Sequence, residues 1–139
     1  MKYLIVIIFI FLSINSFAVE NTNLIKGKKL YLEKKYNDAK IEFEKSIVFN
    51  PKNIESYLYI SKIFNQLKNL NEEEKNLKTA LLLDPKNDEA LYLIINLYIK
   101  EGDFKMAMEK YELFKKACNK CENIQKIQSL IEKLKINEK

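Results

Sequence analysis

The sequence contains no arginine, histidine or tryptophan, and only two glycines, two prolines and two cysteines among its 139 residues. Without histidine, the chain lacks the side chain that most often acts as a general base or a metal ligand. Without arginine, it lacks the planar group that binds phosphates and carboxylates through two parallel hydrogen bonds. Two glycines are too few for a glycine-rich phosphate-binding loop. We therefore expect no enzyme, no metal site and no cofactor.

The residues that are present are typical of a folded, core-forming protein. Hydrophobic residues make up 47% of the chain and charged residues 31%, and the length fits one domain. All 24 basic residues are lysines, set against 19 acidic residues. Because the two signs alternate along the chain instead of forming one basic face, we expect no nucleic-acid binding.

The N-terminal segment, Met1 to Ala18, has the layout of an export signal. Lys2 precedes an apolar run over 3–12, and Ser16-Phe17-Ala18 supplies the small residues that a signal peptidase recognises. The run is short for a membrane-spanning helix, which needs about 20 residues. We expect cleavage after Ala18, no stable membrane span afterwards, and a mature protein in the bacterial periplasm or secreted. The alternative is a retained N-terminal membrane anchor.

The two prolines lie in nearly identical phrases. Pro51 belongs to "VFNPKN" and Pro85 to "LLDPKN", and each follows an apolar run. Proline ends a helix because it lacks an N–H and its ring clashes with the preceding turn. Asn53 and Asn87 can then cap the next helix. Each phrase therefore predicts the end of one helix and the start of another.

Paired helices are predicted between these phrases. Asn71 followed by Glu74 is typical of a capping box, and Gly102 can adopt the positive φ that often ends a helix. The expected pairs are 22–35 with 37–49, 54–67 with 71–83, and 88–100 with 103–118.

The interval from Pro51 to Pro85, with two helices in each unit, matches the period of about 34 residues that is the signature of the tetratricopeptide repeat (TPR). Over about 22–119 the residues at matching positions resemble that family. They are Gly27, Tyr36, Ala39, Phe43 and Pro51 in the first unit; Tyr57, Ile60, Phe64, Leu70, Leu77, Ala80 and Pro85 in the second; and Leu91, Ile94, Tyr98, Gly102, Phe104, Ala107 and Tyr111 in the third. Departures occur where the family has small residues, at Glu73, Ile95 and Phe114, and Asn119 replaces a proline.

The resemblance implies an all-α, right-handed solenoid of three repeats, about 20–53, 54–87 and 88–121, in a domain over 20–139. A last helix over 122–138 carries an apolar stripe of Ile124, Ile127, Leu130, Ile131 and Leu134. We expect it to cap the open end of the stack, which would otherwise expose apolar surface. The alternative is an amphipathic helix that binds a partner.

The resemblance also implies a concave groove, lined by the first helix of each pair, that binds a protein or peptide. The groove positions carried over from the family are Leu24, Lys28, Tyr31, Leu58, Tyr59, Lys62, Asn65, Tyr92, Leu93, Asn96 and Lys100. The tyrosines could be binding anchors, or they could pack between neighbouring helices. The family's clamp for a chaperone's C-terminal carboxylate is absent, since Leu24, Lys28 and Tyr59 break its pattern and there is no arginine.

Cys118 and Cys121 flank the junction between the third unit and the last helix. A redox-active pair normally opens a helix in a βαβ context, and two thiols without histidine make a poor zinc site. We expect a local disulfide or two free thiols. For the whole chain, we expect an adaptor of the cell envelope that binds another protein. The alternative is a structural subunit that self-associates.

Overall fold

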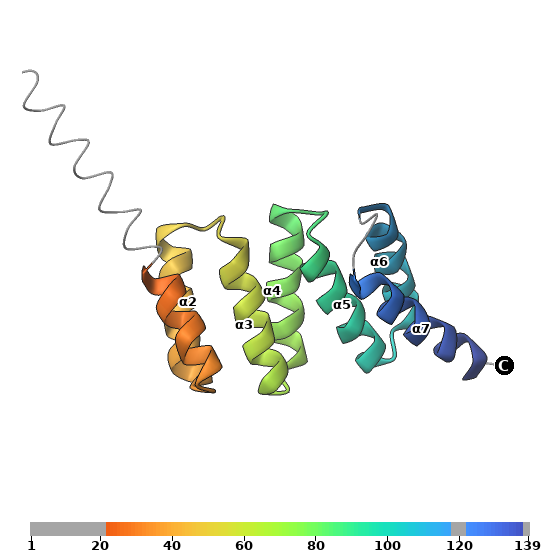
Figure 1. Ribbon diagram of the computed structural model, residues 1–139, viewed down its shortest axis with the longest axis horizontal. Coiled ribbons are helices and arrows are strands. Elements are labelled where there is room, and N and C mark those ends of the chain that lie inside the picture. Colours follow the sequence, from red (N-terminus) through yellow and green to blue (C-terminus); the bar gives the residue numbers. More distant parts are fainter. Residues whose placement is uncertain (1–21, 118–121, 138–139) are drawn as a thin grey trace, which may run out of the picture.

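The computed structural model describes residues 22–117 and 122–137, and every regular element in these ranges is an α-helix. A helix over 22–32 is followed by α2 (Tyr36–Phe49), α3 (Ile54–Gln66), α4 (Leu70–Leu83), α5 (Asp88–Glu101), α6 (Phe104–Ala117) and α7 (Glu122–Asn137). The helices stand side by side along one long axis (Figure 1). The predicted all-α solenoid of stacked helix pairs is confirmed.

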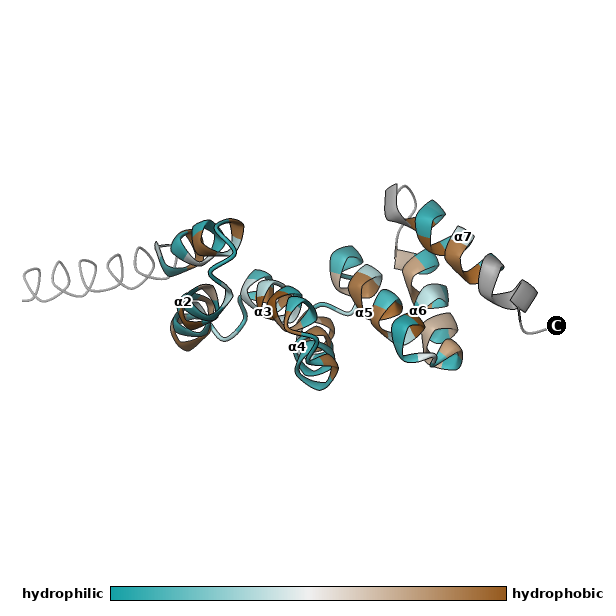
Figure 2. Cartoon of the chain, turned by 90° about the horizontal axis from the view of Figure 1, so that it is seen from below, coloured by the Kyte–Doolittle hydropathy of each residue, from teal (hydrophilic) through white to brown (hydrophobic). Residues whose placement is uncertain are grey.

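Each helix packs chiefly on its neighbours in the sequence. From α2 onward, the most extensive contacts are those of α3 with α4 and of α5 with α6, while α2 meets α3 and α4 meets α5 between pairs. Seen from below, the pairs follow one another along the axis, with apolar residues turned toward adjacent helices (Figure 2). Such a stack is held together by contacts between consecutive elements.

The two proline phrases form the same turn twice. Asn53 Oδ1 accepts a hydrogen bond from the backbone N–H of Ser56 at 3.2 Å, and Asn87 Oδ1 accepts one from that of Ala90 at 3.0 Å. Just before each proline, the side chains of Asn50 and Asp84 each accept from the backbone N–H two positions on, at 3.0 Å. The predicted helix caps at Asn53 and Asn87 are confirmed.

The predicted capping box at Asn71 is wrong. The helix starts earlier, at Leu70, and its cap is Asn69, whose side chain accepts from the backbone N–H of Glu72 at 3.3 Å. Glu74 turns away from the helix start, because it accepts a hydrogen bond from the Tyr98 hydroxyl at 2.9 Å and forms an ion pair with Lys78 at 2.8 Å.

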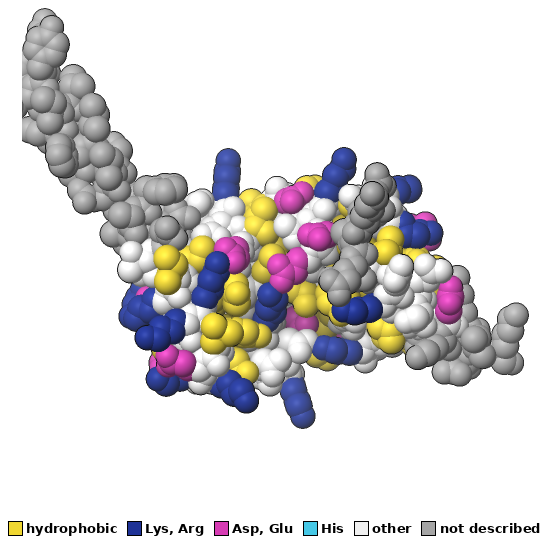
Figure 3. Space-filling model, in the orientation of Figure 1, with side chains coloured by type: hydrophobic (Ala, Val, Ile, Leu, Met, Phe, Trp, Pro, Cys, Tyr) yellow, Lys and Arg dark blue, Asp and Glu magenta, His cyan; other side chains and the backbone are white. Residues whose placement is uncertain are grey.

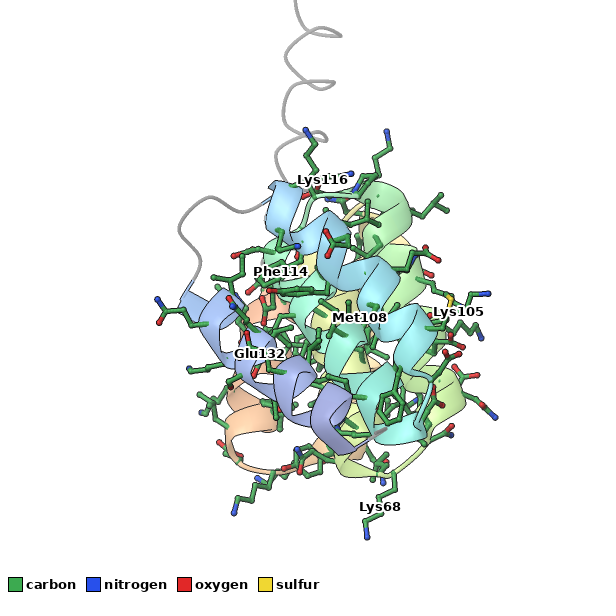
Figure 4. All side chains as sticks on the ribbon, turned by 90° about the vertical axis from the view of Figure 1, so that its right-hand side faces the viewer. Lys68, Lys105, Met108, Phe114, Lys116 and Glu132 are labelled. Carbon is green, nitrogen blue, oxygen red and sulfur yellow. The ribbon has the colours of Figure 1, made fainter. Side chains whose placement is uncertain are left out.

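The turns inside the three helix pairs share one backbone conformation. Gly102 has φ of 76°, as predicted, and Lys34 and Lys68 have φ of 59° and 56°. These three residues occupy the same position in successive repeats. Lys68 lies at the tip of its turn and points away from the helices (Figure 4). Of the three, only Gly102 is a glycine, the residue that adopts a left-handed conformation without a steric cost because it has no Cβ.

The core runs through the stack as two apolar clusters. The first joins the helix over 22–32, α2 and α3 around Ala39, Phe43, Ile60 and Ile63. The second extends from α3 to α7. Burying these faces between pairs supplies the main stabilising free energy of the fold.

The last helix covers the end of the stack. α7 packs on both α5 and α6, and its Ile127 and Ile131 are buried in the larger cluster. Phe114, at a position where the repeat has a small residue, is fully buried on the side of α6 that faces α7 (Figure 4). The cap therefore accounts for one of the departures from the repeat pattern.

Two predictions fall outside the described residues. The export signal over 1–18 and the pairing of Cys118 with Cys121 both lie there, so they stay predictions. Among the described residues, none of the helices combines the length and apolar character needed to cross a membrane.

The close packing of Gly27 on Phe43 yields a stability prediction. A Cβ added at Gly27 would lie 2.7 Å from Cε1 of Phe43, a fully buried ring. Because the ring must shift, we expect Gly27→Ala to lower the free energy of unfolding by about 1–3 kcal/mol, measured by urea denaturation. In the Phe43→Leu background the same change should cost less. An equal cost in both backgrounds would show that the contact with Phe43 is not the cause.

Candidate binding groove

A cavity of about 350 Å³ lies between the first helices of the three pairs. Its walls come from the helix over 22–32, α3 and α5, and α4 contributes one residue. The lining residues are Tyr31, Ser61, Lys62, Asn65, Gln66, Glu73, Tyr92, Leu93, Asn96 and Lys100. Lysines, acidic residues and hydrophobic side chains are mixed on the face seen in Figure 3.

Two ion pairs cross from one first helix to the next. Lys28 contacts Glu55 at 2.6 Å, and Lys62 contacts Glu89 at 2.5 Å. The two lysines occupy matching repeat positions, and so do the two glutamates, so the same bridge occurs at both junctions. Both of these groove lysines therefore already have a carboxylate partner within the chain. Lys100 forms no ion pair with any residue that the structure describes.

Tyr59 is partly buried and packs between helices. Its ring stacks on Phe43, with centroids 4.8 Å apart, and meets Tyr31 edge-on at 5.3 Å. The ammonium group of Lys62 lies 4.7 Å from the same ring, within cation–π distance. Of the two roles considered for this tyrosine, packing between neighbouring helices is therefore the one that matches its contacts. Tyr31 both packs on Tyr59 and lines the cavity. Burial raises the pKa of the Tyr31 hydroxyl.

The carried-over groove residues divide into two groups. Those that line the cavity are Tyr31, Lys62, Asn65, Tyr92, Leu93, Asn96 and Lys100. Leu24, Lys28, Leu58 and Tyr59 do not line it. Leu58 is a correction, because its side chain is only 4% exposed and belongs to the core. The resemblance to the repeat family assigned Leu58 to the groove, because repeat spacing alone does not show how far the helix is rotated.

Glu73, like Ser61 and Gln66, lines the cavity although the sequence did not assign it to the groove. It comes from α4, a second helix, and is 2% exposed. Asn65 Nδ2 donates to Glu73 Oε1 at 2.7 Å, but Oε2 has no hydrogen-bond partner in the part of the chain that the structure describes. Burial raises the pKa of this carboxyl, and the Asn65 hydrogen bond and the charge of Lys100 oppose that shift. In the sequence, the feature that could have pointed to Glu73 is its position, because the repeat has a small residue there.

Comparison with known proteins identifies the fold. No protein-family profile matches the chain, and no curated protein matches its sequence. Among solved structures, the Arabidopsis OM64 TPR domain is similar with a TM-score of 0.77 and 19% identity, covering 85% of this chain and 98% of that one. The chain therefore has the tetratricopeptide-repeat fold.

Two further similar structures are complexes. The yeast Sti1 TPR2B domain, in complex with pHsp70, has a TM-score of 0.78 and 15% identity, covering 86% of this chain and 98% of its own. The Yersinia enterocolitica type III secretion chaperone SycD, with a peptide of the translocator YopD, has a TM-score of 0.78 and 13% identity, covering 86% and 94%. At these identities the likeness establishes the fold alone.

The buried carboxylate yields a second stability prediction. Because burial lifts the folded-state pKa of Glu73 above 4.5, ionisation disfavours the folded state. The unfolding free energy of the wild type should therefore fall relative to Glu73→Gln as the pH rises above that value. At pH 7 we expect the variant to be more stable by about 1 kcal/mol, measured by urea denaturation across the pH range.

Glu72→Gln is the matched control for that prediction. It removes the same charge from the same turn, but Glu72 forms only an exposed ion pair with Lys75 at 3.4 Å. Exposed pairs contribute little to stability. If both variants show the same pH dependence, the burial of Glu73 does not cause it.

Proposed function

We propose that the protein is an exported adaptor that binds a segment of another protein in the groove between its first helices. The observation that supports this most directly is the cavity that spans all three helix pairs. It presents Tyr92 and Leu93 as apolar contacts, and Asn96 and Lys100 as polar ones. A concave surface with a few polar groups among apolar walls is the usual form of a binding site.

The similar structures support a peptide as the bound form. The Sti1 domain is described in complex with pHsp70, and SycD with a peptide of YopD. The partner here differs from a chaperone C-terminus, because the chain has no arginine and Lys28 and Lys62 are already paired. A terminal carboxylate would have to break these ion pairs to be held by Lys28 or Lys62, and at Lys100 it would meet the negative charge of Glu73. We therefore propose recognition of an internal segment.

The place of action that we propose is the cell envelope. The proposal rests on the segment before Val19 alone, with its charged start, its apolar run and the small residues Ser16 and Ala18 at its end. The mature protein would then begin at Val19 and act in the periplasm or outside the cell, in assembly or maintenance of the envelope.

Export makes a direct prediction about mass. We expect the protein purified from its native envelope to lack residues 1–18, because Ser16 and Ala18 suit signal-peptidase cleavage. Intact-mass spectrometry measures this. A Ser16→Leu, Ala18→Leu variant, which removes both small residues, should keep the full mass. Finding the full-length chain for the wild type would favour the retained membrane anchor.

Self-association is the alternative function, and one observation favours it. Val48 and Leu82 occupy equivalent positions on α2 and α4 and are 78% and 82% exposed. Two equivalent apolar side chains on the second helices could contact another copy. Mass measured against concentration separates the two functions, since a monomer at about tens of micromolar favours the adaptor.

The adaptor function predicts the effect of two groove substitutions. We expect Tyr92→Ala with Lys100→Ala to weaken partner binding by about 30-fold or more, because a buried tyrosine contact is often a hot spot. The partner is first identified by a photo-crosslinking residue placed at Gln66, which is exposed and lines the cavity. Affinity is then measured by calorimetry.

The control is a lysine remote from the cavity. Lys105 lies on α6 and points outward (Figure 4), so Lys105→Ala should leave the affinity unchanged. Circular dichroism checks that every variant is folded. Full binding by a folded Tyr92→Ala, Lys100→Ala variant would place the binding site elsewhere.

A further inference from the structure

The floor of the cavity carries a polar pair where the other repeats are apolar. Asn65 and Glu73 occupy the repeat positions that Tyr31 and Ala39 hold in the first pair. The same positions in the third pair are Ile99 and Ala107. Of the three pairs, only the middle one therefore places a partly buried side-chain hydrogen bond, Asn65 Nδ2 to Glu73 Oε1, at this crossing.

We expect this substitution of polar for apolar residues to lower the stability of the fold, because the hydrogen bonds of the Glu73 carboxylate are incomplete. A carboxylate that is 2% exposed has lost most of its water, and such a group is costly unless both oxygens are hydrogen-bonded. Oε2 of Glu73 is itself buried and has no hydrogen-bond partner among the described residues, although the residue lines the cavity. An occupant of the cavity that donates a hydrogen bond would satisfy it.

The charges around the cavity restrict what the donor can be. Lys62 is held by Glu89, and Lys100 lines the cavity without an ion pair among the described residues. A cationic side chain would meet the charge of Lys100, and a carboxylate would meet that of Glu73. The cavity offers one acceptor, Oε2 of Glu73, and one donor, the ammonium group of Lys100. An uncharged group that both donates and accepts hydrogen bonds would match the two.

We propose that the cavity binds the carboxamide of an asparagine or glutamine side chain in the partner segment. The amide nitrogen donates to Oε2 of Glu73, and the amide oxygen accepts from the ammonium group of Lys100. Tyr92 and Leu93 contact the methylene groups beside the carboxamide. This inference rests on the proposed function, because it names the side chain that the groove selects.

The test is selection from a phage-displayed library of random heptapeptides on the purified protein. We expect asparagine or glutamine to be enriched at one position of the peptides that bind. In a synthetic peptide of the selected sequence, replacing that residue by aspartate or glutamate, which keeps the shape, should weaken binding by about tenfold or more. Selection on Glu73→Gln should lose the preference, and selection on Glu72→Gln should keep it.

The other outcomes are distinguishable. Enrichment of lysine or arginine, or of acidic residues, at that position would overturn the carboxamide while leaving a peptide-binding groove. So would a carboxamide preference that survives Glu73→Gln. Binding that is unaffected by Tyr92→Ala with Lys100→Ala would place the selected peptides outside the cavity and overturn the inference. If folded wild-type protein selects no peptide, both the inference and the proposed function fail.

Discussion

The packing of each helix pair on the next is the constraint on which the structure depends. A single pair of amphipathic helices leaves one apolar face uncovered, and stacking covers it. Gly27 against Phe43 shows how close this packing is, since the glycine leaves no more room than the ring needs. At the last pair α7 provides the cover in place of a fourth unit.

The groove follows from the same stacking. The first helices bury one face against the second helices, so their opposite faces remain side by side and open. The ion pairs Lys28–Glu55 and Lys62–Glu89 join these faces at the two junctions. Exposed ion pairs add little free energy, but they occupy lysines that would otherwise attract an acidic partner. Glu73 and Lys100 remain as charged groups in the cavity without an ion pair among the described residues, and the proposed carboxamide would contact both.

The sequence predicted the helices better than the site. Proline, asparagine and glycine act on their own turn, so Pro51, Asn53 and Gly102 located helix boundaries directly. At the start of α4 the same pattern, asparagine followed by glutamate in the next turn, occurs at Asn69 and again at Asn71. In the structure Asn69 is the cap, and Glu74 instead accepts a hydrogen bond from Tyr98 on the next helix along the chain. A local pattern contains no information about such a contact.

The site depends on how helices are rotated against each other, and repeat spacing leaves this rotation open. Spacing placed Leu58 and Tyr59 on a first helix, but only the structure shows that Leu58 enters the core and Tyr59 stacks on Phe43. Glu73 was noticed as a departure from the repeat. Its role in the cavity could be inferred only from the structure, which shows that Glu73 is buried and that its Oε2 has no hydrogen-bond partner among the described residues.

The left-handed turns at Lys34, Lys68 and Gly102 bear on how such a chain can lengthen or shorten. A left-handed lysine costs about 1 kcal/mol relative to glycine, yet two of the three turns tolerate it. Each hairpin therefore reverses direction without help from a particular residue. Duplication or deletion of a whole helix-pair unit would preserve every turn and both kinds of junction, so evolution can alter the reach of the groove in single-repeat steps.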